Sequence, residues 1–359
     1  MSTNSFSERS HQKLAVRRIG ETPGLEAGLG RDRVVSGDFD GDRYLLDCRS
    51  FIDHALDHYL KNNHQVTSLL HQAICYSVLD GGKRFRPILT LAVGELFGAK
   101  RRVLLPFACA IELIHCYSLI HDDLPALDND DLRRGKPSCH KRFGEAIALL
   151  AGDALLTEAF FIMSDPRAAR HLGVPLTSKL IREVSDAAGI RGMIGGQSTE
   201  IELVKRKVTP ALLESLDRLK TGALIMTAAR VGAIIGGAAR KDLDRITRYA
   251  QALGLAFQIT DDILDGHEVS SDKSDPKGLT NYLSVAGPAK AGERVKDLLH
   301  DCLREMQPYG RKAEPLRKMA RFVALRTNAG TDEHGKGFSP ASSPDNSQGL
   351  KAVSPARHL

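Results

Sequence analysis

The chain has 359 residues, which is enough for two average domains or one large one, and its 42% of hydrophobic residues can fill a sizeable core. The net charge is +6, with Lys and Arg scattered along the chain rather than clustered. This distribution argues against nucleic-acid binding, and we find no apolar run long enough for stable insertion in a membrane.

The cysteines are typical of a protein in a reducing compartment. None of the six belongs to a CxxC pair or has a His at zinc-ligand spacing, and Cys109 and Cys116 fall in an apolar stretch where we expect buried thiols. The N-terminus lacks the apolar segment of a secretory signal. We therefore expect a cytoplasmic protein. Because the first residues carry Ser and Arg but few acids, an organelle transit peptide is the alternative.

The chain divides into an ordered body and two flanking segments. Residues 1–43 have weak apolar periodicity, and residues 329–359 are rich in Gly, Ser, Pro and Asn, so we expect both to be poorly ordered. Residues 44–328 have the helical period and no alternating runs typical of strands. This pattern predicts a single all-α bundle of about ten helices, drawn from residues 45–60, 66–79, 88–97, 104–121, 145–163, 177–194, 210–219, 220–237, 243–264, 298–306 and 315–326.

The first motif in this body is GGKRFRP, in which two glycines precede Lys83, Arg84 and Arg86. Glycine lets the backbone approach a ligand closely, and Lys83 and Arg86 could hold an anion between them. A basic helix start exposed to water would have the same composition, so this motif alone leaves both interpretations open.

The segment from His115 to Pro137 concentrates acid beside two arginines. Five aspartates fall within ten positions and two arginines follow them: Asp122, Asp123, Asp128, Asp130, Asp131, Arg133 and Arg134. Carboxylates this close repel one another, and hard divalent cations relieve the repulsion. Guanidinium groups match phosphate oxygens. The segment therefore predicts a site for a metal-bound phosphate or diphosphate, with a solvated acidic loop as the alternative.

A second acidic cluster contains Asp261, Asp262 and Asp265. A helix places Asp261 and Asp265 on one face, because they are four residues apart. Asp122 and Asp128 are six apart and would lie on different sides of a regular helix, but Pro125 would break the helix and could bring Asp128 back toward Asp122. Two such clusters on separate helices could hold Mg²⁺ ions from opposite sides, bridged to a diphosphate. The alternative for the second cluster is a solvent-facing helix edge.

The sequence resembles the trans-isoprenyl diphosphate synthases, or polyprenyl synthetase family. The resemblance covers residues 45–328 and rests on motifs that occur in the family's order: GGKRFRP, DDLPALDNDDLRRGKP, GGQ, KTG and FQITDDILD. It implies an isoprenoid-synthase bundle with the active site in a central cavity. It also implies condensation of isopentenyl diphosphate with an allylic diphosphate, and a homodimer.

The resemblance assigns roles to matching positions. It implies three Mg²⁺ ions, with Mn²⁺ as a possible substitute, bound by Asp122, Asp123, Asp128, Asp261, Asp262 and Asp265. It implies contacts to the allylic diphosphate from Arg133, Lys220, Thr221 and Gln258, and to isopentenyl diphosphate from Lys83, Arg86, His115 and Arg134. The catalytic set is then Asp122, Asp123, Asp128, Arg133, Lys220 and Asp261.

Product length is expected to depend on Tyr117, which lies five residues before Asp122 and so roughly 7–8 Å further along the helix. A bulky ring there could close the floor of the pocket. The aromatic residue, the two extra residues inside the aspartate motif and the SCH after GKP resemble the bacterial farnesyl type, so we expect a C15 product. A C20 geranylgeranyl product is the alternative, because those enzymes share NDDLRRGKP. Tyr117 as an ordinary core residue also stays open.

Two positions depart from the family pattern. Glu200 stands where the family has Asp after GGQ, and the segment after Asp265 is shorter than the family's lysine-bearing flap, so either Lys273 or Lys277 could contact diphosphate. The short flap raises the alternative of a weakly active regulatory paralogue. A terpene cyclase is a third hypothesis, but GGKRFRP argues against it, since a cyclase binds no isopentenyl diphosphate.

Overall fold

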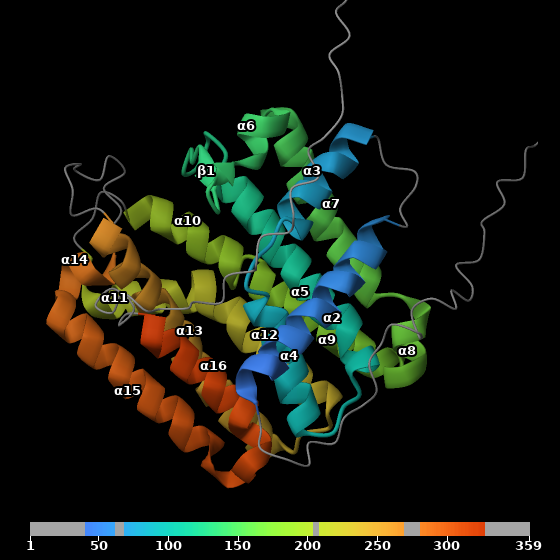
Figure 1. Ribbon diagram of the computed structural model, residues 1–359, viewed down its shortest axis with the longest axis vertical. Coiled ribbons are helices and arrows are strands. Elements are labelled where there is room, and N and C mark those ends of the chain that lie inside the picture. The colour runs from blue at the N-terminus through green and yellow to red at the C-terminus, as the bar shows by residue number, and fades with distance from the viewer. Residues whose placement is uncertain (1–39, 62–67, 204–207, 269–280, 327–359) are drawn as a thin grey trace, which may run out of the picture.

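A computed structural model describes residues 40–61, 68–203, 208–268 and 281–326 (Figure 1). The C-terminal tail, Lys273 and Lys277 lie outside these residues, as does the N-terminal extension apart from its last residues. The first described helix, α2, begins at Gly41, three residues before the predicted start of the ordered body.

The described chain is helical almost throughout, which confirms the predicted all-α class. Its α-helices are α2 (Gly41–Lys61), α3 (Ser68–Leu79), α4 (Phe85–Leu96), α5 (Arg101–Asp122), α6 (Cys139–Phe143), α7 (Glu145–Met163), α8 (Pro166–Leu172), α9 (Val174–Ala188), α10 (Met193–Leu203), α11 (Pro210–Asp217), α12 (Ala223–Ile235), α13 (Arg240–Glu268), α14 (Tyr282–Ala286), α15 (Pro288–Met306) and α16 (Glu314–Leu325). A π-helical turn, η1 (Arg218–Gly222), joins α11 to α12, and a 3₁₀ turn, η2 (Gln307–Ala313), precedes α16.

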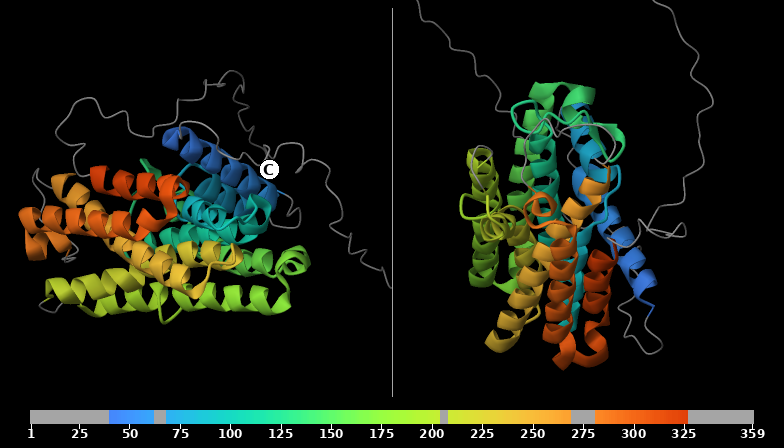
Figure 2. Two further views of the ribbon diagram at one scale, coloured as in Figure 1. Left: turned by 90° about the horizontal axis from the view of Figure 1, so that it is seen from below. Right: turned by 90° about the vertical axis from the view of Figure 1, so that its left-hand side faces the viewer.

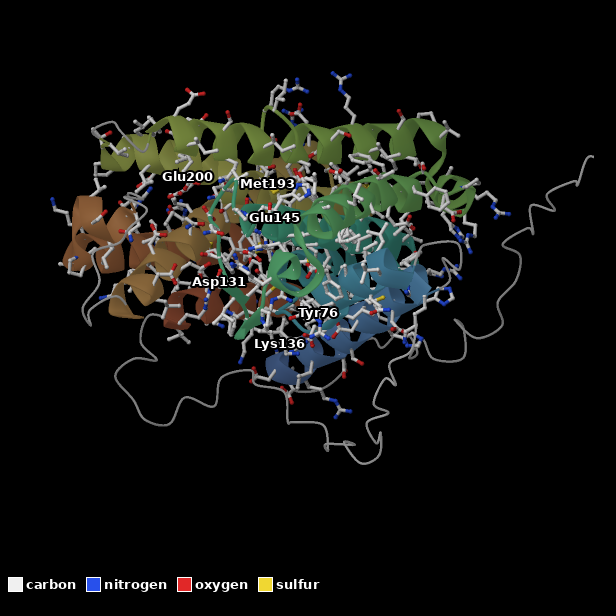
Figure 3. The ribbon with its side chains drawn as sticks, turned by 90° about the horizontal axis from the view of Figure 1, so that it is seen from above. Tyr76, Asp131, Lys136, Glu145, Met193 and Glu200 are labelled. Atoms are coloured by element: carbon white, nitrogen blue, oxygen red, sulfur yellow. The ribbon has the colours of Figure 1, made fainter. Side chains whose placement is uncertain are left out.

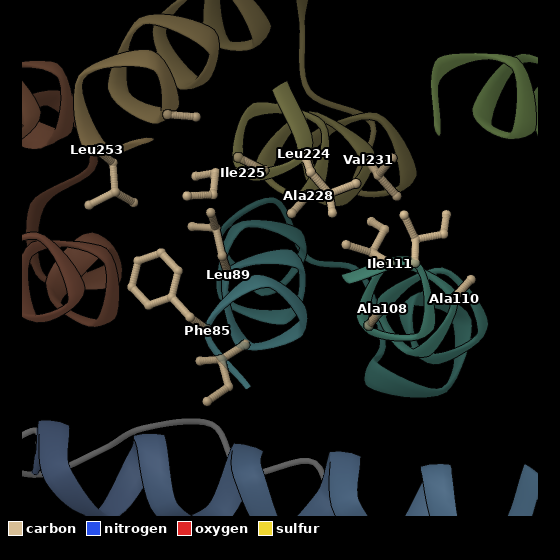
Figure 4. Packing of buried hydrophobic residues seen from close by; sticks show 14 of the residues in the cluster. Phe85, Leu89, Ala108, Ala110, Ile111, Leu224, Ile225, Ala228, Val231 and Leu253 are labelled. Atoms are coloured by element: carbon tan, nitrogen blue, oxygen red, sulfur yellow. The ribbon is translucent and has the colours of Figure 1, made fainter. Parts of the chain in front are cut away.

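Helix α5 lies in the core of the bundle and packs against α4, α7 and α12. It is apolar around most of its circumference, as a helix surrounded by other helices requires. Helices α2 and α16 lie on one side of the molecule, and α9 and α10 lie on the other (Figure 2). Leu89 of α4, Ile111 of α5 and Ala228 of α12 belong to the same buried cluster (Figure 4).

Arg84 holds four helices together at the start of α4. Its side chain is buried and donates hydrogen bonds to Asp53 Oδ1 (2.6 Å), Glu112 Oε1 (3.0 Å) and the Val78 carbonyl (2.6 Å). These partners lie on α2, α5 and α3. A buried charge is tolerated only when it is paired in this way. Arg84 is therefore a structural member of GGKRFRP, whereas Lys83 and Arg86 are free of this network.

The structure corrects three expectations. Residues Leu132–Arg133 (β1) and Lys136–Pro137 (β2) form a short antiparallel hairpin, which is too short for strand periodicity to reveal. Helix α15 begins at Pro288, ten residues before the predicted start at residue 298. The apolar pattern missed its first turns because the outer face of the helix is charged. Two described helices, α5 and α7, are also long and apolar enough to cross a membrane by length and composition, although α5 is 72% buried inside the protein.

Candidate active site

The first acidic cluster lies where α5 ends. Asp122 is the last residue of the helix, and the chain turns back so that the Asp128 N–H donates a hydrogen bond of 2.8 Å to the Asp122 carbonyl. The expected break near Pro125 is thus present, and it returns Asp128 to Asp122. Burial raises the pKa of Asp122 to about 6; Lys220 opposes this shift and Asp128 adds to it. Two carboxyls this close favour a bound cation.

Asp123, the next residue, is engaged by Arg133. Asp123 is 2% exposed, and the Arg133 Nε donates to its two oxygens at 3.0 and 3.2 Å, with a further contact from Nη2. The hairpin supplies this arginine. Its turn residues, Arg134 and Gly135, have φ of 56° and 75°, as the two central residues of a type I′ turn require. Asp123 therefore anchors the hairpin in this structure.

The same turn places Arg134 over GGKRFRP. Arg134 Nη1 donates to the Gly81 carbonyl at 2.6 Å, and a Cβ on Gly82 would lie 3.0 Å from Arg134 Nη2. The φ of 124° at Gly82 is also unfavourable for any other residue. The glycine is thus required where the hairpin meets the start of α4.

A positively charged group forms at this junction. Arg86 is buried, and its Nε has no hydrogen-bond partner in the part of the chain that the structure describes. Burial, with Arg86 and Arg134 nearby, lowers the pKa of His115 well below its usual value, so its imidazole is neutral at pH 7. Burial also lowers the pKa of Lys83, with Arg326 adding to the effect. The predicted residues Arg86, His115 and Arg134 are thus together, and they fit an anion. Lys83 lies between this group and the second acidic cluster, since Asp261 opposes its shift.

Asp262 of the second cluster is held by hydrogen bonds on both oxygens. Its Oδ1 accepts from Gln258 Nε2 (2.9 Å) and its Oδ2 accepts from the Tyr282 backbone N–H (2.7 Å). Gln258 Oε1 in turn accepts from Thr221 Oγ1 at 2.8 Å. The network ties η1, α13 and α14 together, so Asp262 orients its neighbours.

Asp261 faces a different partner. Its Oδ1 lies 2.7 Å from Arg326 Nη1, and the Arg326 guanidinium covers the Phe257 ring at 5.3 Å. Asp265, one turn further along α13, is exposed. Sequence reasoning missed Arg326; the only signal was an arginine at the end of the last helical pattern.

Lys220 lies beside the first acidic cluster. It pairs with Glu200 of α10, and Asp122 and Asp128 also interact with its charge and raise its pKa against the effect of burial. The π-helical turn that carries Lys220 is packed tightly, because a Cβ on Gly196 would lie 2.5 Å from the Lys220 backbone nitrogen. Glu200 of α10 is visible in the same view from above as Asp131 and Lys136, which lie in and beside the hairpin (Figure 3).

Two further buried groups belong to this region. Tyr117 is 4% exposed, its hydroxyl has no hydrogen-bond partner among the described residues, and its ring lies edge-on to His121 at 5.7 Å. Asp217, the last residue of α11, is buried beside Asp262 and Glu200, and burial raises its pKa to about 8. Sequence reasoning did not select Asp217, because it lies outside both aspartate motifs.

The donor set fits a hard cation. Asp122, Asp128 and Asp261 offer carboxylate oxygens, the ligand type that Mg²⁺ prefers. Within the described part of the chain no three acidic, His or Cys side chains are close enough to hold a metal by themselves. A cation here would take its remaining ligands from water and from a phosphate.

The chain is similar to known prenyl diphosphate synthases. The polyprenyl synthetase profile matches residues 67–278. Farnesyl diphosphate synthase of Geobacillus stearothermophilus is 43% identical over 255 residues, 68% of this chain and 85% of the relative. Geranylgeranyl pyrophosphate synthase 4 of Arabidopsis thaliana is 36% identical over 300 residues, 81% of this chain and 79% of the relative. The crystal structure of a geranyltransferase from Legionella pneumophila has a TM-score of 0.73 at 32% identity, covering 80% of this chain and 98% of that one.

The fold and the matches define a prenyltransferase of the short-chain trans type. The chain belongs to the polyprenyl synthetase family.

The tight packing of Gly196 against Lys220 can be tested by substitution. Replacing Gly196 with Ala would press a methyl group against the backbone of Lys220, so we expect the free energy of unfolding to fall by about 1–3 kcal/mol. Chemical denaturation measures this change. Gly292→Ala in α15 is the matched control, because nothing lies within 4 Å of its Cβ position, and it should stabilise by about 1 kcal/mol. Equal effects of the two substitutions would contradict the packing argument.

Proposed function

We propose that the protein is a Mg²⁺-dependent farnesyl diphosphate synthase. It condenses isopentenyl diphosphate with dimethylallyl or geranyl diphosphate and releases diphosphate. The observation that carries this proposal is the position of Lys220, which pairs with Glu200 and interacts with the charges of Asp122 and Asp128. The next residue, Thr221, is linked through Gln258 to Asp262 of the second cluster. The positive charge of Lys220 suits a diphosphate that is bound to metal ions at both acidic clusters.

The two substrates would bind to different groups. Asp122, Asp128 and Asp261 would hold Mg²⁺ on the allylic diphosphate, with Mn²⁺ as a substitute and three ions as the proposed number. Lys220 and Arg133 would contact the same diphosphate. Arg86, His115, Arg134 and Lys83 would hold isopentenyl diphosphate.

Several of the assigned residues have protein partners in this structure. Asp123 accepts from Arg133, Asp262 accepts from Gln258 and Tyr282, and Gln258 accepts from Thr221. We infer that Asp262 and Gln258 act by orienting Asp261 and Thr221. Arg133 would turn from Asp123 toward phosphate when the substrate binds.

The chain's residues would stabilise charge as the bond to diphosphate breaks. Bound Mg²⁺ supplies Lewis-acid stabilisation of the departing diphosphate. Lys220 and Arg133 add fixed positive charge at the same oxygens. The apolar walls of α5 and α12 exclude water from the allylic cation. The double bond of isopentenyl diphosphate attacks this cation, and loss of a proton to the released diphosphate completes the reaction.

A condensation assay tests the proposal. The purified protein is incubated with Mg²⁺, isopentenyl diphosphate and geranyl diphosphate, and the products are separated by chain length. We expect farnesyl diphosphate. A C20 product would replace the proposal with a geranylgeranyl synthase, which the Arabidopsis relative also supports. Absence of any product would favour the regulatory paralogue, whose motivation is the short segment carrying Lys273 and Lys277.

Tyr117 is the proposed determinant of product length. Its buried ring lies on α5 one and a half turns before Asp122, and the unpartnered hydroxyl is consistent with apolar surroundings. Tyr117→Ala should shift the main product beyond C15, because the ring no longer fills that volume. Tyr117→Phe is the control: it keeps the ring, removes only the hydroxyl and should leave product length unchanged. Identical products from wild type and Tyr117→Ala would place the end of the pocket elsewhere.

We propose a cytoplasmic homodimer that associates through α7. One face of α7 packs on α5, and the other exposes Leu149, Leu150 and Phe161 to about half or more of their area, at 48%, 51% and 63%. Three large apolar side chains on one exposed face are typical of an interface. A second copy would cover them and would account for the apolar character of this helix without a membrane.

Leu150→Glu should therefore favour the monomer, since it places a charge in the proposed interface. Light scattering after size-exclusion chromatography measures the mass. Leu46→Glu on α2 is a matched control, because Leu46 is 52% exposed but lies on another helix. A dimer that persists in Leu150→Glu would contradict this interface.

A further inference from the structure

His140 is a buried histidine that the proposed chemistry does not use. It is the last residue of the SCH segment after GKP and lies in the first turn of α6. The side chain is 5% exposed, and its Nε2 has no hydrogen-bond partner among the residues that the structure describes. A buried polar atom normally has a partner, so an unpartnered Nε2 needs an explanation.

Ser138 fixes the orientation of this ring. Its Oγ lies 3.0 Å from His140 Nδ1, and its backbone N–H donates to the Asp131 carbonyl at 2.9 Å, which joins the start of α6 to the hairpin segment. A serine hydroxyl can donate to Nδ1, and a neutral imidazole then carries its hydrogen on Nε2. A protonated imidazole carries a hydrogen on Nε2 in any case. Nε2 is therefore available as a donor.

The start of α6 lies beside Asp123. Burial raises the pKa of Asp123, and both Arg133 and His140 oppose this shift with their charge. Burial also raises the pKa of Cys139, the first residue of α6, and Asp123 adds to that shift. Two consecutive residues of α6 are thus close enough to Asp123 for their electrostatic interactions with it to matter.

Asp123 is the acid near His140 that lacks a second donor. Asp131 also interacts with His140, but it is exposed and pairs with Lys141 at 2.8 Å. Asp123 is buried, and within the described chain the hydrogen bonds to its carboxylate all come from Arg133. If Arg133 turns to the diphosphate, as proposed above, this carboxylate stays buried without a donor, which is unfavourable.

We propose that His140 is a positioning residue that takes over the Asp123 carboxylate when Arg133 turns to the diphosphate. The Nε2–H of His140 then donates to Asp123 in place of the guanidinium, so the acid remains satisfied. Because Asp122 is the adjacent residue, holding Asp123 also holds the Asp122 carboxylate in place for Mg²⁺. Groups that orient metal ligands in this way change the affinity of the site. The inference rests on the proposed function, since it requires Arg133 to exchange partners.

The test compares two substitutions that keep opposite parts of the imidazole. His140→Asn can keep a polar atom near Ser138 but has none at the Nε2 position, whereas His140→Gln can bring an amide N–H to that position. Titration calorimetry measures the binding of inorganic diphosphate with Mg²⁺ and again in EDTA, and the Mg²⁺-dependent part reports on the acidic clusters. We expect His140→Asn to bind about tenfold more weakly, because Asp123 is left without a donor, and His140→Gln to bind within about twofold of wild type.

The two variants also separate this role from a structural one. If His140 acted only through its contact with Ser138, His140→Gln would be the weaker binder, and that order would overturn the proposal. Equal affinities in the two variants, whether lowered or unchanged, would overturn it as well. His300→Asn is the control, since His300 is exposed on α15, and it should leave binding unchanged.

The measurement does not depend on turnover. If the protein makes no prenyl product but the two His140 variants bind diphosphate in the expected order, the proposed function fails and this inference stands. If farnesyl diphosphate forms but the variants bind equally well, the proposed function stands and the role of His140 is disproved.

Discussion

The structure depends on how a crowded set of carboxylates is neutralised. Asp122, Asp128, Asp217, Asp262 and Glu200 share one region, and like charges this close resist ionising together. The chain meets this constraint with its own cations, through the pairs Asp123–Arg133, Asp261–Arg326 and Glu200–Lys220. Binding of a metal-loaded diphosphate would exchange these partners, with cations replacing arginine at the acids and phosphate replacing carboxylate at Arg133 and Lys220.

The basic residues divide into two kinds by what they touch. Arg84 is fully paired by Asp53 and Glu112 and fixes helices to one another. Arg86, two residues later, is also buried, but its Nε has no partner within residues 40–61, 68–203, 208–268 and 281–326, and it lies beside a neutral His115. Burial alone does not distinguish the structural arginine, Arg84, from Arg86, which we expect to bind an anion. The missing partner does, because an unpaired buried guanidinium is favourable only when an anion arrives.

The helical period predicted the fold class and most long helices, and the motifs predicted where the acids gather. Pro125 even predicted the break that returns Asp128 to Asp122. The contacts were beyond reach of one-dimensional reasoning. The pairing of Asp123 with Arg133 needs a hairpin that is too short to have a sequence pattern. Arg326, at the end of the described chain, pairs with Asp261, which is 65 residues earlier. Asp217 is notable only because its neighbours in space are acids. Each depends on which helices pack together, and periodicity does not specify that.

The π-helical turn between α11 and α12 has a consequence for how this segment can vary. A turn of this kind holds one more residue than an α-helical turn, so the side chains before and after it are out of step with a regular helix. Deleting one residue would restore regular winding and rotate everything on one side by roughly 100°. Asp217 and Lys220 could then no longer face the same acids. Substitutions on the outer face of this segment should be tolerated through evolution, whereas a change in its length should not.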